Sequence, residues 1–374
     1  MDELLLLSRY FYHRPSDLRK ILEEVGTEKI MAAPKDAFLK IGISGKALDD
    51  FIEARSQKAE SRSDTRDVKA VTIFDKEYPA ALKNIYDAPP IMFYRGELGL
   101  VQDRDGALAP QNSSCKNEGE KPRIAVVGSR KMSEYGRRAA EEFVKDLALH
   151  FIVVSGLAFG IDSFAHEVAL RNGGGAIAVL GSGLGEKDVY TKSNLFLAKK
   201  ILESGGLLLS EIPPGVGPQK FHFPMRNRII AGLARGILII EAGEKSGTLI
   251  TARFGLESGA DIFAVPNNIF YPNAGGVNYL IKCGAHPVTA GQDILDFYGI
   301  KSAGRRSEYA PKNALEKIIL DGMDADGLHM DEIKALTKTE IANLIEALTD
   351  LEMAGVVKNI GGKYTRIQKL ENRK

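Results

Sequence analysis

Cysteines, long apolar runs and a basic leader are scarce or missing in this sequence of 374 residues. Its two cysteines, Cys115 and Cys283, lie far apart and outside any CxxC spacing, which argues against a disulfide framework or a zinc site. Nowhere do about 18 apolar residues follow one another, as a membrane-spanning helix requires. The first residues are acidic where a signal peptide would be basic. We therefore expect a cytoplasmic protein with reduced thiols, no metal ion, no cofactor and no membrane contact.

An excess of charge of either sign is also missing. The chain has 50 Lys and Arg against 49 Asp and Glu, a formal net charge of +1. This balance does not exclude a nucleic-acid partner, because phosphate binding needs a local basic patch and not a basic protein. The length and the 44% hydrophobic content are sufficient for two or three domains.

The first part of the chain, residues 1–88, is predicted to be a small helical domain and its connection. Residues 18–33 and 36–55 carry apolar side chains at helical spacing. The second stretch resembles a SAM or helix-hairpin-helix turn, in which backbone amides meet a phosphate; a plain helical cap is the alternative. Residues 99–122 are polar and rich in Gly, Asn and Ser, which predicts a flexible linker or loop.

The middle part, residues 89–308, is predicted to be α/β: a Rossmann-like, doubly wound, mostly parallel sheet. Six short apolar runs are typical of strands buried on both faces, and helical patterns separate them. These runs are RIAVVG, FIVVSG, AIAVLG, LLLSEI, ILIIEA and DIFAVP. Chemistry in such a sheet belongs at the carboxyl ends of the strands.

The segments that follow the strands are rich in glycine and hydroxyl residues, as a phosphate-binding edge requires. They include GSR at residues 128–130, SGLAFGID at 155–162, GSGLG at 181–185 and SGT at 246–248. A Walker A motif is absent, and no segment completes the G-x-G-x-x-G fingerprint. An ordinary NAD or ATP site is therefore not expected.

The segment KFHFPMRNR, residues 220–228, places cations between aromatic residues without a neutralising acid. If the segment is extended, Lys220 and His222 point to one side, and Phe221 and Phe223 point to the other. Single-stranded nucleic acid needs such a surface, because its bases stack on rings while cations neutralise its phosphates. The alternative makes either phenylalanine a core residue and the arginines a solvated helix start.

Several of these segments together resemble the bacterial DNA-processing protein A family, also called DprA or Smf. The resemblance rests on VVGSR, SGLAFGIDSFAH, the long run from residue 210 to 270, and GGVNYLIKCGA. It implies a non-catalytic, single-stranded DNA-binding protein that protects incoming DNA during natural transformation and passes it to the RecA recombinase. It also implies a homodimer.

The resemblance also implies a DNA-binding site that can be assigned residue by residue. Its members are Gly128, Ser129, Arg130, Ser155, Gly156, Gly160, Lys220, Phe223, Arg226, Asn227, Arg228, Ser246, Gly247 and Thr248. Arg226, Arg228 and the SGT segment are expected to form its rim.

Acid–base chemistry is the alternative for a few residues. Asp162 and His166 are four residues apart on one helix face, but helix capping or the orientation of a loop amide explains Asp162 at less cost. Glu211 and Glu241 are interpreted as anchors for loop amides or arginines. The alternative function is a nucleotide-processing enzyme related to phosphoribohydrolases, although Thr251 stands where those enzymes carry a catalytic glutamate.

The last part, residues 309–374, is predicted to be a winged-helix-like domain. Three helical patterns precede two short alternating strands around Gly361 and Gly362. Its lysines are interspersed with acidic residues, so both a DNA contact and a protein contact remain open.

Overall fold

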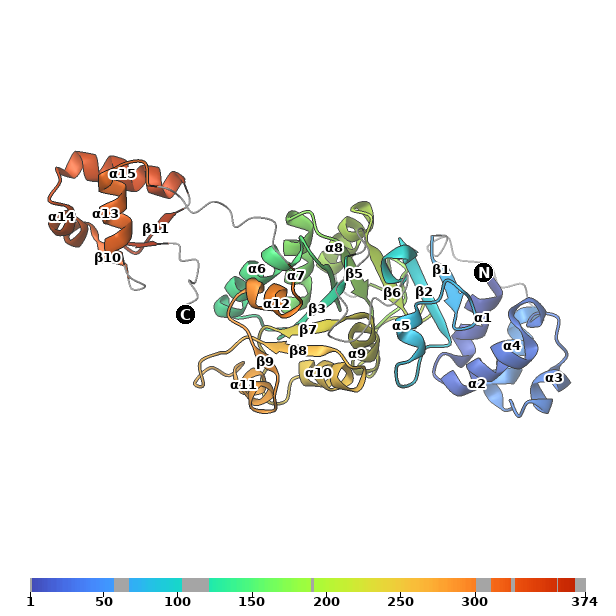
Figure 1. The fold of residues 1–374 in the computed structure, drawn as a ribbon. Helices are drawn as coiled ribbons and strands as arrows, with labels where there is room; N and C mark the ends of the chain where they lie inside the picture. The colour runs from blue at the N-terminus through green and yellow to red at the C-terminus, as the bar shows by residue number, and fades with distance from the viewer. Residues whose placement is uncertain are drawn as a thin grey trace. The chain divides into compact units, whose positions relative to one another are not determined.

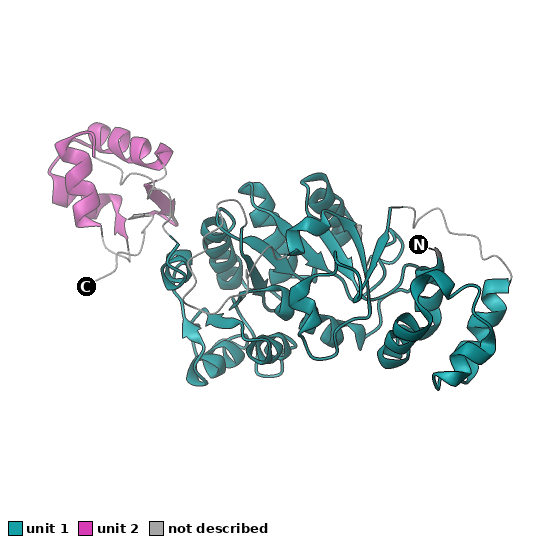
Figure 2. Ribbon diagram, turned by 45° about the vertical axis from the view of Figure 1, so that its right-hand side comes forward, with its two compact units in different colours: residues 1–300 teal, residues 301–374 magenta. Residues whose placement is uncertain are grey.

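The chain divides into two compact units, residues 1–300 and 301–374 (Figure 2). The computed structural model describes residues 2–56, 67–102, 121–189, 192–300, 311–323, 327–354 and 356–366. Cys115 and most of the loop expected at 99–122 lie outside the described residues.

The N-terminal part of the first unit is helical, as predicted. Its helices are α1 Asp2–Phe11, α2 Pro15–Lys20, α3 Lys35–Lys40 and α4 Lys46–Ser56, with a π-helical turn over Ile21–Val25 and a 3-10 turn over Thr27–Lys29. Phe38 and Phe51 are fully buried, and their rings meet edge to face with centroids 6.0 Å apart. Gly42 and Gly45 turn the chain between α3 and α4 with φ of 80° and 91°, a backbone region that favours glycine. The likeness to a SAM or helix-hairpin-helix turn stays a prediction.

The rest of the first unit is built on a nine-stranded sheet (Figure 1). The six predicted strands are β3 Arg123–Val127, β4 Ile152–Ser155, β5 Ala176–Val179, β6 Leu207–Ser210, β7 Gly236–Ile239 and β8 Asp261–Ala264. They form one parallel block in the order β6-β5-β4-β3-β7-β8. This confirms the doubly wound, mostly parallel fold.

Three further strands extend this block at its two edges. They are β1 Lys69–Thr72, β2 Ile91–Gly96 and β9 His286–Pro287. Strand β2 runs antiparallel to β6 and to β1, whereas β9 runs parallel to β8. The sheet therefore begins at Lys69, before the boundary expected at residue 89.

Helices cover both faces of the sheet (Figure 1). In chain order they are α5 Ala80–Lys83, α6 Glu134–Leu147, α7 Ile161–Arg171, α8 Lys192–Glu203, α9 His222–Leu233, α10 Thr248–Glu257, α11 Gly275–Lys282 and α12 Gly291–Phe297; a 3-10 turn spans Leu98–Val101. Ile229 of α9 and Val277 of α11 share one core with alternate strand residues, while Phe143 of α6 shares another core with Ile294 of α12. Among the described residues, no helix combines the length and the apolar composition that crossing a bilayer needs.

The second unit has its own small core and the predicted winged-helix order. It consists of α13 Ala314–Gly322, β10 Leu328–His329, α14 Met330–Thr337, α15 Ile341–Met353, β11 Val357–Ile360 and β12 Lys363–Arg366. Ile319, Ile333, Leu344 and Leu351 are buried together. The hairpin β11-β12 is the predicted wing, and the short strand β10, which pairs with β12, was not expected.

Candidate nucleic-acid interface

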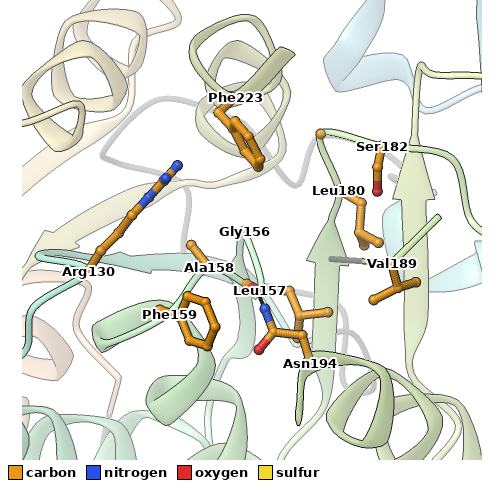
Figure 3. Close-up of a pocket in the computed structure, with 11 residues that line it drawn as sticks. Arg130, Gly156, Leu157, Ala158, Phe159, Leu180, Ser182, Val189, Asn194 and Phe223 are labelled. Carbon is orange, nitrogen blue, oxygen red and sulfur yellow. Dashed lines mark hydrogen bonds between the residues drawn. The ribbon is translucent and has the colours of Figure 1, made fainter. Parts of the chain in front are cut away.

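A pocket opens at the carboxyl edge of the sheet, close to the point where the strand order reverses between β3 and β7. Its described lining comes from the segments after β3, β4 and β5 and from the start of α8 and α9 (Figure 3). The lining residues are Arg130, Gly156, Leu157, Ala158, Phe159, Leu180, Gly181, Ser182, Val189, Asn194 and Phe223.

Arg130 and Phe223 meet across this pocket from different elements (Figure 3). The guanidinium carbon of Arg130 lies 4.8 Å from the centroid of the Phe223 ring, within the range of a cation–π contact. Arg130 is exposed and Phe223 is half-buried. The structure thus brings two predicted site residues together at the surface, and neither belongs to the hydrophobic core.

The segment KFHFPMRNR does not have the extended conformation considered in the sequence analysis. Helix α9 begins at His222, so Phe223 lies in its first turn and the strand-like alternation of sides is wrong. Pro224 fits there because the first turn of a helix needs no backbone N–H donor. Phe221 is 52% exposed, which is incompatible with a core role, and Lys220 is exposed in the turn before α9.

The loops after β3, β4 and β7 are joined to one another by hydrogen bonds. Gly160 has φ of 82°, and a Cβ there would collide with the carbonyl oxygen of Ser129. The N–H of Ile161 donates to that same oxygen at 3.2 Å. The hydroxyl of Thr248 donates to the carbonyl of Gly128 at 3.2 Å and accepts from the hydroxyl of Ser246 at 3.0 Å. These hydroxyls serve first to fix the loops, which holds the pocket in shape.

Ser155 and Arg226, both expected at the binding surface, lie inside the protein. The hydroxyl of Ser155 donates to the carbonyl of Val126 at 2.6 Å, and Ser155 is fully buried. Arg226 is 3% exposed, and its Nη1 donates to the carbonyls of Gly156, at 2.6 Å, and Val179. Its expected place on the rim is therefore wrong: Arg226 joins the ends of β4 and β5 beneath the pocket.

Gly156 is required by this arrangement, since a Cβ would occupy the space of the Arg226 guanidinium. Its N–H donates to Oδ2 of Asp162 at 3.1 Å. Burial lowers the pKa of Arg226 to about 10 and raises the pKa of Asp162. The interpretation of Asp162 as an anchor for a loop amide is confirmed.

Arg228 also faces the protein, whereas Asn227 is half-buried. Nη2 of Arg228 lies 2.6 Å from Oε2 of Glu211, and only 5% of this arginine side chain is exposed, so its rim position is wrong too. Nδ2 of Asn227 reaches the carbonyl of Gly247 at 3.4 Å. Glu211 therefore anchors an arginine, as expected from the sequence.

Glu241 also acts as an anchor, since it accepts the backbone N–H and the hydroxyl of Ser133, at 2.9 and 2.7 Å. His166 is fully buried below the pocket, and burial lowers its pKa to about 3. An imidazole that is enclosed and neutral near pH 7 cannot exchange protons with a substrate in the pocket. Within the described ranges, no three His, Cys, Asp or Glu side chains gather as metal ligands would.

Sequence reasoning missed several residues that line the pocket. Phe159 is 44% exposed there, and the amide of Asn194 donates to the carbonyl of Leu157 at 2.7 Å. Phe159 lies within the SGLAFGID segment, in which only the glycines were assigned to the site. A large apolar residue between two glycines of a loop that resembles a phosphate-binding loop indicates a ligand contact, and this signal was available for Phe159. The sequence around Asn194 contains no such signal.

Two protein-family models match this chain, one within each of its two units. The model of the family described as DNA recombination-mediator protein A matches residues 69–109 and 113–299, and that of the DprA winged helix domain matches residues 304–363. DNA processing protein DprA of Streptococcus pneumoniae is 44% identical over 225 residues, which are 60% of this chain and 72% of that protein.

Two solved structures have the same fold. The crystal structure of DprA from Streptococcus pneumoniae matches with a TM-score of 0.60 and 36% identity, over 78% of this chain and 97% of that one. The structure of DNA processing protein A from Helicobacter pylori, which concerns its single-stranded DNA binding mode, matches with a TM-score of 0.50 and 24% identity, over 61% of this chain and 94% of that one. The matched family model spans more than half of the sequence, and this chain therefore belongs to the DNA recombination-mediator protein A family.

Proposed function

We propose that this protein binds single-stranded DNA at the pocket beside Arg130 and Phe223. The observation that carries the proposal is the contact between the exposed Arg130 guanidinium and the half-buried Phe223 ring. A base stacks on an aromatic face, and an arginine or lysine neutralises the phosphates beside it. The Helicobacter pylori relative, with its single-stranded DNA binding mode, supports the same ligand.

The shape of the site favours single strands over duplex DNA. The walls of a recess between loops carry Phe223, Phe159 and Arg130. Only a base that is not stacked on its neighbours in the nucleic acid can reach an aromatic face in such a recess. Bases in a duplex are already stacked and paired, and bringing one out costs a few kcal/mol. Lys220, exposed in the turn before α9, is a further cation on the segment that leads to Phe223.

We also propose that this binding is not coupled to catalysis. The described residues that line the pocket include no carboxylate and no histidine, although glycosidic hydrolysis needs an acid or base within reach. Thr251, in the place of the glutamate of phosphoribohydrolases, is 2% exposed. These observations disfavour the alternative of a nucleotide-processing enzyme.

We also propose a location in the cell, an oligomeric state and a protein partner. The family resemblance supports a cytoplasmic homodimer that protects incoming DNA in natural transformation and delivers it to the RecA recombinase. Light scattering on the purified protein tests the dimer by its molar mass. Strand-exchange assays with RecA on DNA coated by a single-strand-binding protein test the delivery.

The binding experiment itself compares a single-stranded oligonucleotide with a duplex of the same sequence over a range of salt. We expect a preference for the single strand, little dependence on sequence, and an affinity that falls steeply as salt rises, because phosphate contacts release counterions. Equal affinity for the duplex at moderate salt would contradict the proposal. Incubation with nucleoside monophosphates tests the enzymatic alternative, since release of a free base would favour it.

A further inference from the structure

The loop between β8 and α11, residues 266–274, exposes three large apolar side chains in succession. Ile269 is 77% exposed, Phe270 is 88% exposed and Tyr271 is 58% exposed. Single exposed apolar residues are common on soluble proteins, but an adjacent group of them marks a contact surface. We call residues 266–274 the aromatic loop.

The aromatic loop is held in place by its own hydrogen bonds. Oδ1 of Asn268 accepts the backbone N–H of Phe270, and the carbonyl of Asn268 accepts that of Tyr271, both at 3.0 Å. The side-chain amide of Asn278 bridges both backbone groups of Asn267, at 2.9 and 3.3 Å. The loop is therefore already ordered, and binding of a ligand to these rings costs little conformational entropy of the loop.

The aromatic loop is joined directly to the turn that carries Arg130. Nδ2 of Asn273 donates to the carbonyl of Lys131 at 3.0 Å, and the Tyr135 hydroxyl donates to the carbonyl of Pro266 at 2.6 Å. In the sheet, β3 and β8 are separated only by β7. Two strand spacings amount to about 10 Å between the ends of β3 and β8, so a strand that leaves the pocket at Arg130 can reach the loop within a few nucleotides.

The charges along this edge suit a polyanion. Residues 262–276 include no charged side chain, and Lys131 is exposed between Arg130 and the aromatic loop. Lys245, after β7, is exposed as well, but Glu244 beside it makes that segment mixed in sign. Lys131 is therefore the main cation for a backbone that passes from Arg130 to Phe270.

We propose that the aromatic loop is a second stacking subsite for single-stranded nucleic acid, with Lys131 binding the phosphates between it and the pocket. This inference rests on the proposed function, because it extends the strand bound at Arg130 and Phe223. The bases contact Phe270 and Tyr271, and stacking makes the subsite indifferent to sequence. Oligonucleotides too short to leave the pocket do not reach it.

The test measures the affinity of the full-length protein for a series of oligothymidylates of increasing length. In the double variant Phe270→Ala and Tyr271→Ala, we expect short oligonucleotides to bind as in the wild type and longer ones to bind about 5-fold or more weakly, with an unchanged salt slope. Lys131→Ala should reduce that slope for the longer ones. Tyr86→Ala is the matched control, since Tyr86 is 79% exposed and lies outside both the pocket and the aromatic loop.

Phe223→Ala, measured in the same series, separates this inference from the proposed function. If Phe223→Ala weakens binding at all lengths while the double variant binds long strands like the wild type, the second subsite is refuted and the pocket stands. If Phe223→Ala is also without effect, the proposed function fails. A double variant with a changed molar mass in light scattering and unchanged affinity would show that the aromatic loop joins two copies of the chain, which also refutes the subsite.

Discussion

The guanidinium of Arg130 lies over the Phe223 ring, with 4.8 Å between its carbon and the ring centroid. Arg130 comes from the turn after β3, and Phe223 comes from the first turn of α9, 93 positions later in the chain. The contact fixes the direction of a long, flexible side chain at the surface before any ligand arrives. It also places a positive charge beside an aromatic face. The phosphate backbone of a single strand can contact the charge while a base stacks on the ring.

Lys220→Ala and Phe223→Ala should therefore change the affinity for single-stranded DNA in different ways. Lys220→Ala should flatten the dependence of affinity on salt, because a lysine contributes chiefly through released counterions. Phe223→Ala should leave this slope nearly unchanged and lower the affinity by roughly 5- to 150-fold, which corresponds to about 1 to 3 kcal/mol of stacking. Fluorescence anisotropy with a labelled oligonucleotide at several salt concentrations measures both quantities.

Thermal unfolding of the same Phe223→Ala preparation provides the control. A core phenylalanine would cost about 3 to 5 kcal/mol of folding stability on truncation. The half-buried ring predicts a smaller loss. A large loss of stability with unchanged affinity of the folded fraction would rule out the stacking role.

Arg130→Ala should weaken binding to all oligonucleotides alike, because the guanidinium contacts the backbone and carries no base preference. Arg253→Ala is a suitable control, since that arginine has 69% of its side chain exposed on α10 and does not line the pocket. Competition between oligonucleotides of different composition measures the uniformity of the effect. Wild-type affinity in Arg130→Ala would remove this residue from the site.

Arg226→Met should act on stability. The substitution leaves the carbonyls of Gly156 and Val179 without this donor and the buried Asp162 carboxylate without its cationic neighbour, and removing one partner of a buried pair costs about 3 to 5 kcal/mol. Urea unfolding followed by circular dichroism measures the loss. If the variant kept its stability but lost affinity, Arg226 would have to contact the DNA after all.

His166 should make folding less stable in acid. Its pKa is lowered to about 3 in the folded protein by burial and by the charge of Arg226, whereas the unfolded chain titrates near 6.5. Between these values the unfolded state binds the extra proton, so stability is complete above about pH 6.5 and falls as the pH decreases toward 3, by up to ~1.4 kcal/mol per pH unit. Urea midpoints from pH 7 to pH 4 measure this slope, and His166→Gln should reduce it. Equal slopes in both proteins would contradict the assignment.

A chain that ends at Ile300 should fold and bind single-stranded DNA. The first unit ends there, and the winged-helix unit has a separate core of its own. Circular dichroism checks the fold and anisotropy checks the binding. A folded chain without affinity would assign part of the site to residues 301–374.

The parallel strands could be predicted because each is a short apolar run buried on both faces, as in ILIIEA. Strands β1 and β2 carry mixed sequences at the antiparallel edge, so their pattern is weak. The first residues of α9 favour extended chain by sequence, because alternating aromatic and polar residues have the period of a strand and a proline disfavours helical angles at the residue before it. Pro224 is equally compatible with the first turn of a helix, which is where the fold places it. Arg226 and Arg228 looked exposed because no acid stands within their segment. Their partners lie 70 and 17 positions away, at Gly156 and Glu211, and only the fold brings them together.

The ring of Phe223 beneath Arg130 has a spectroscopic consequence. The sequence contains no tryptophan, so its ultraviolet emission comes from tyrosine. Phe223→Trp would place the only indole of the protein against a guanidinium at the mouth of the pocket, and a base that stacks there would quench its emission. Stopped-flow mixing with an unlabelled oligonucleotide would then follow the arrival of a single base at this position, without a dye on either partner.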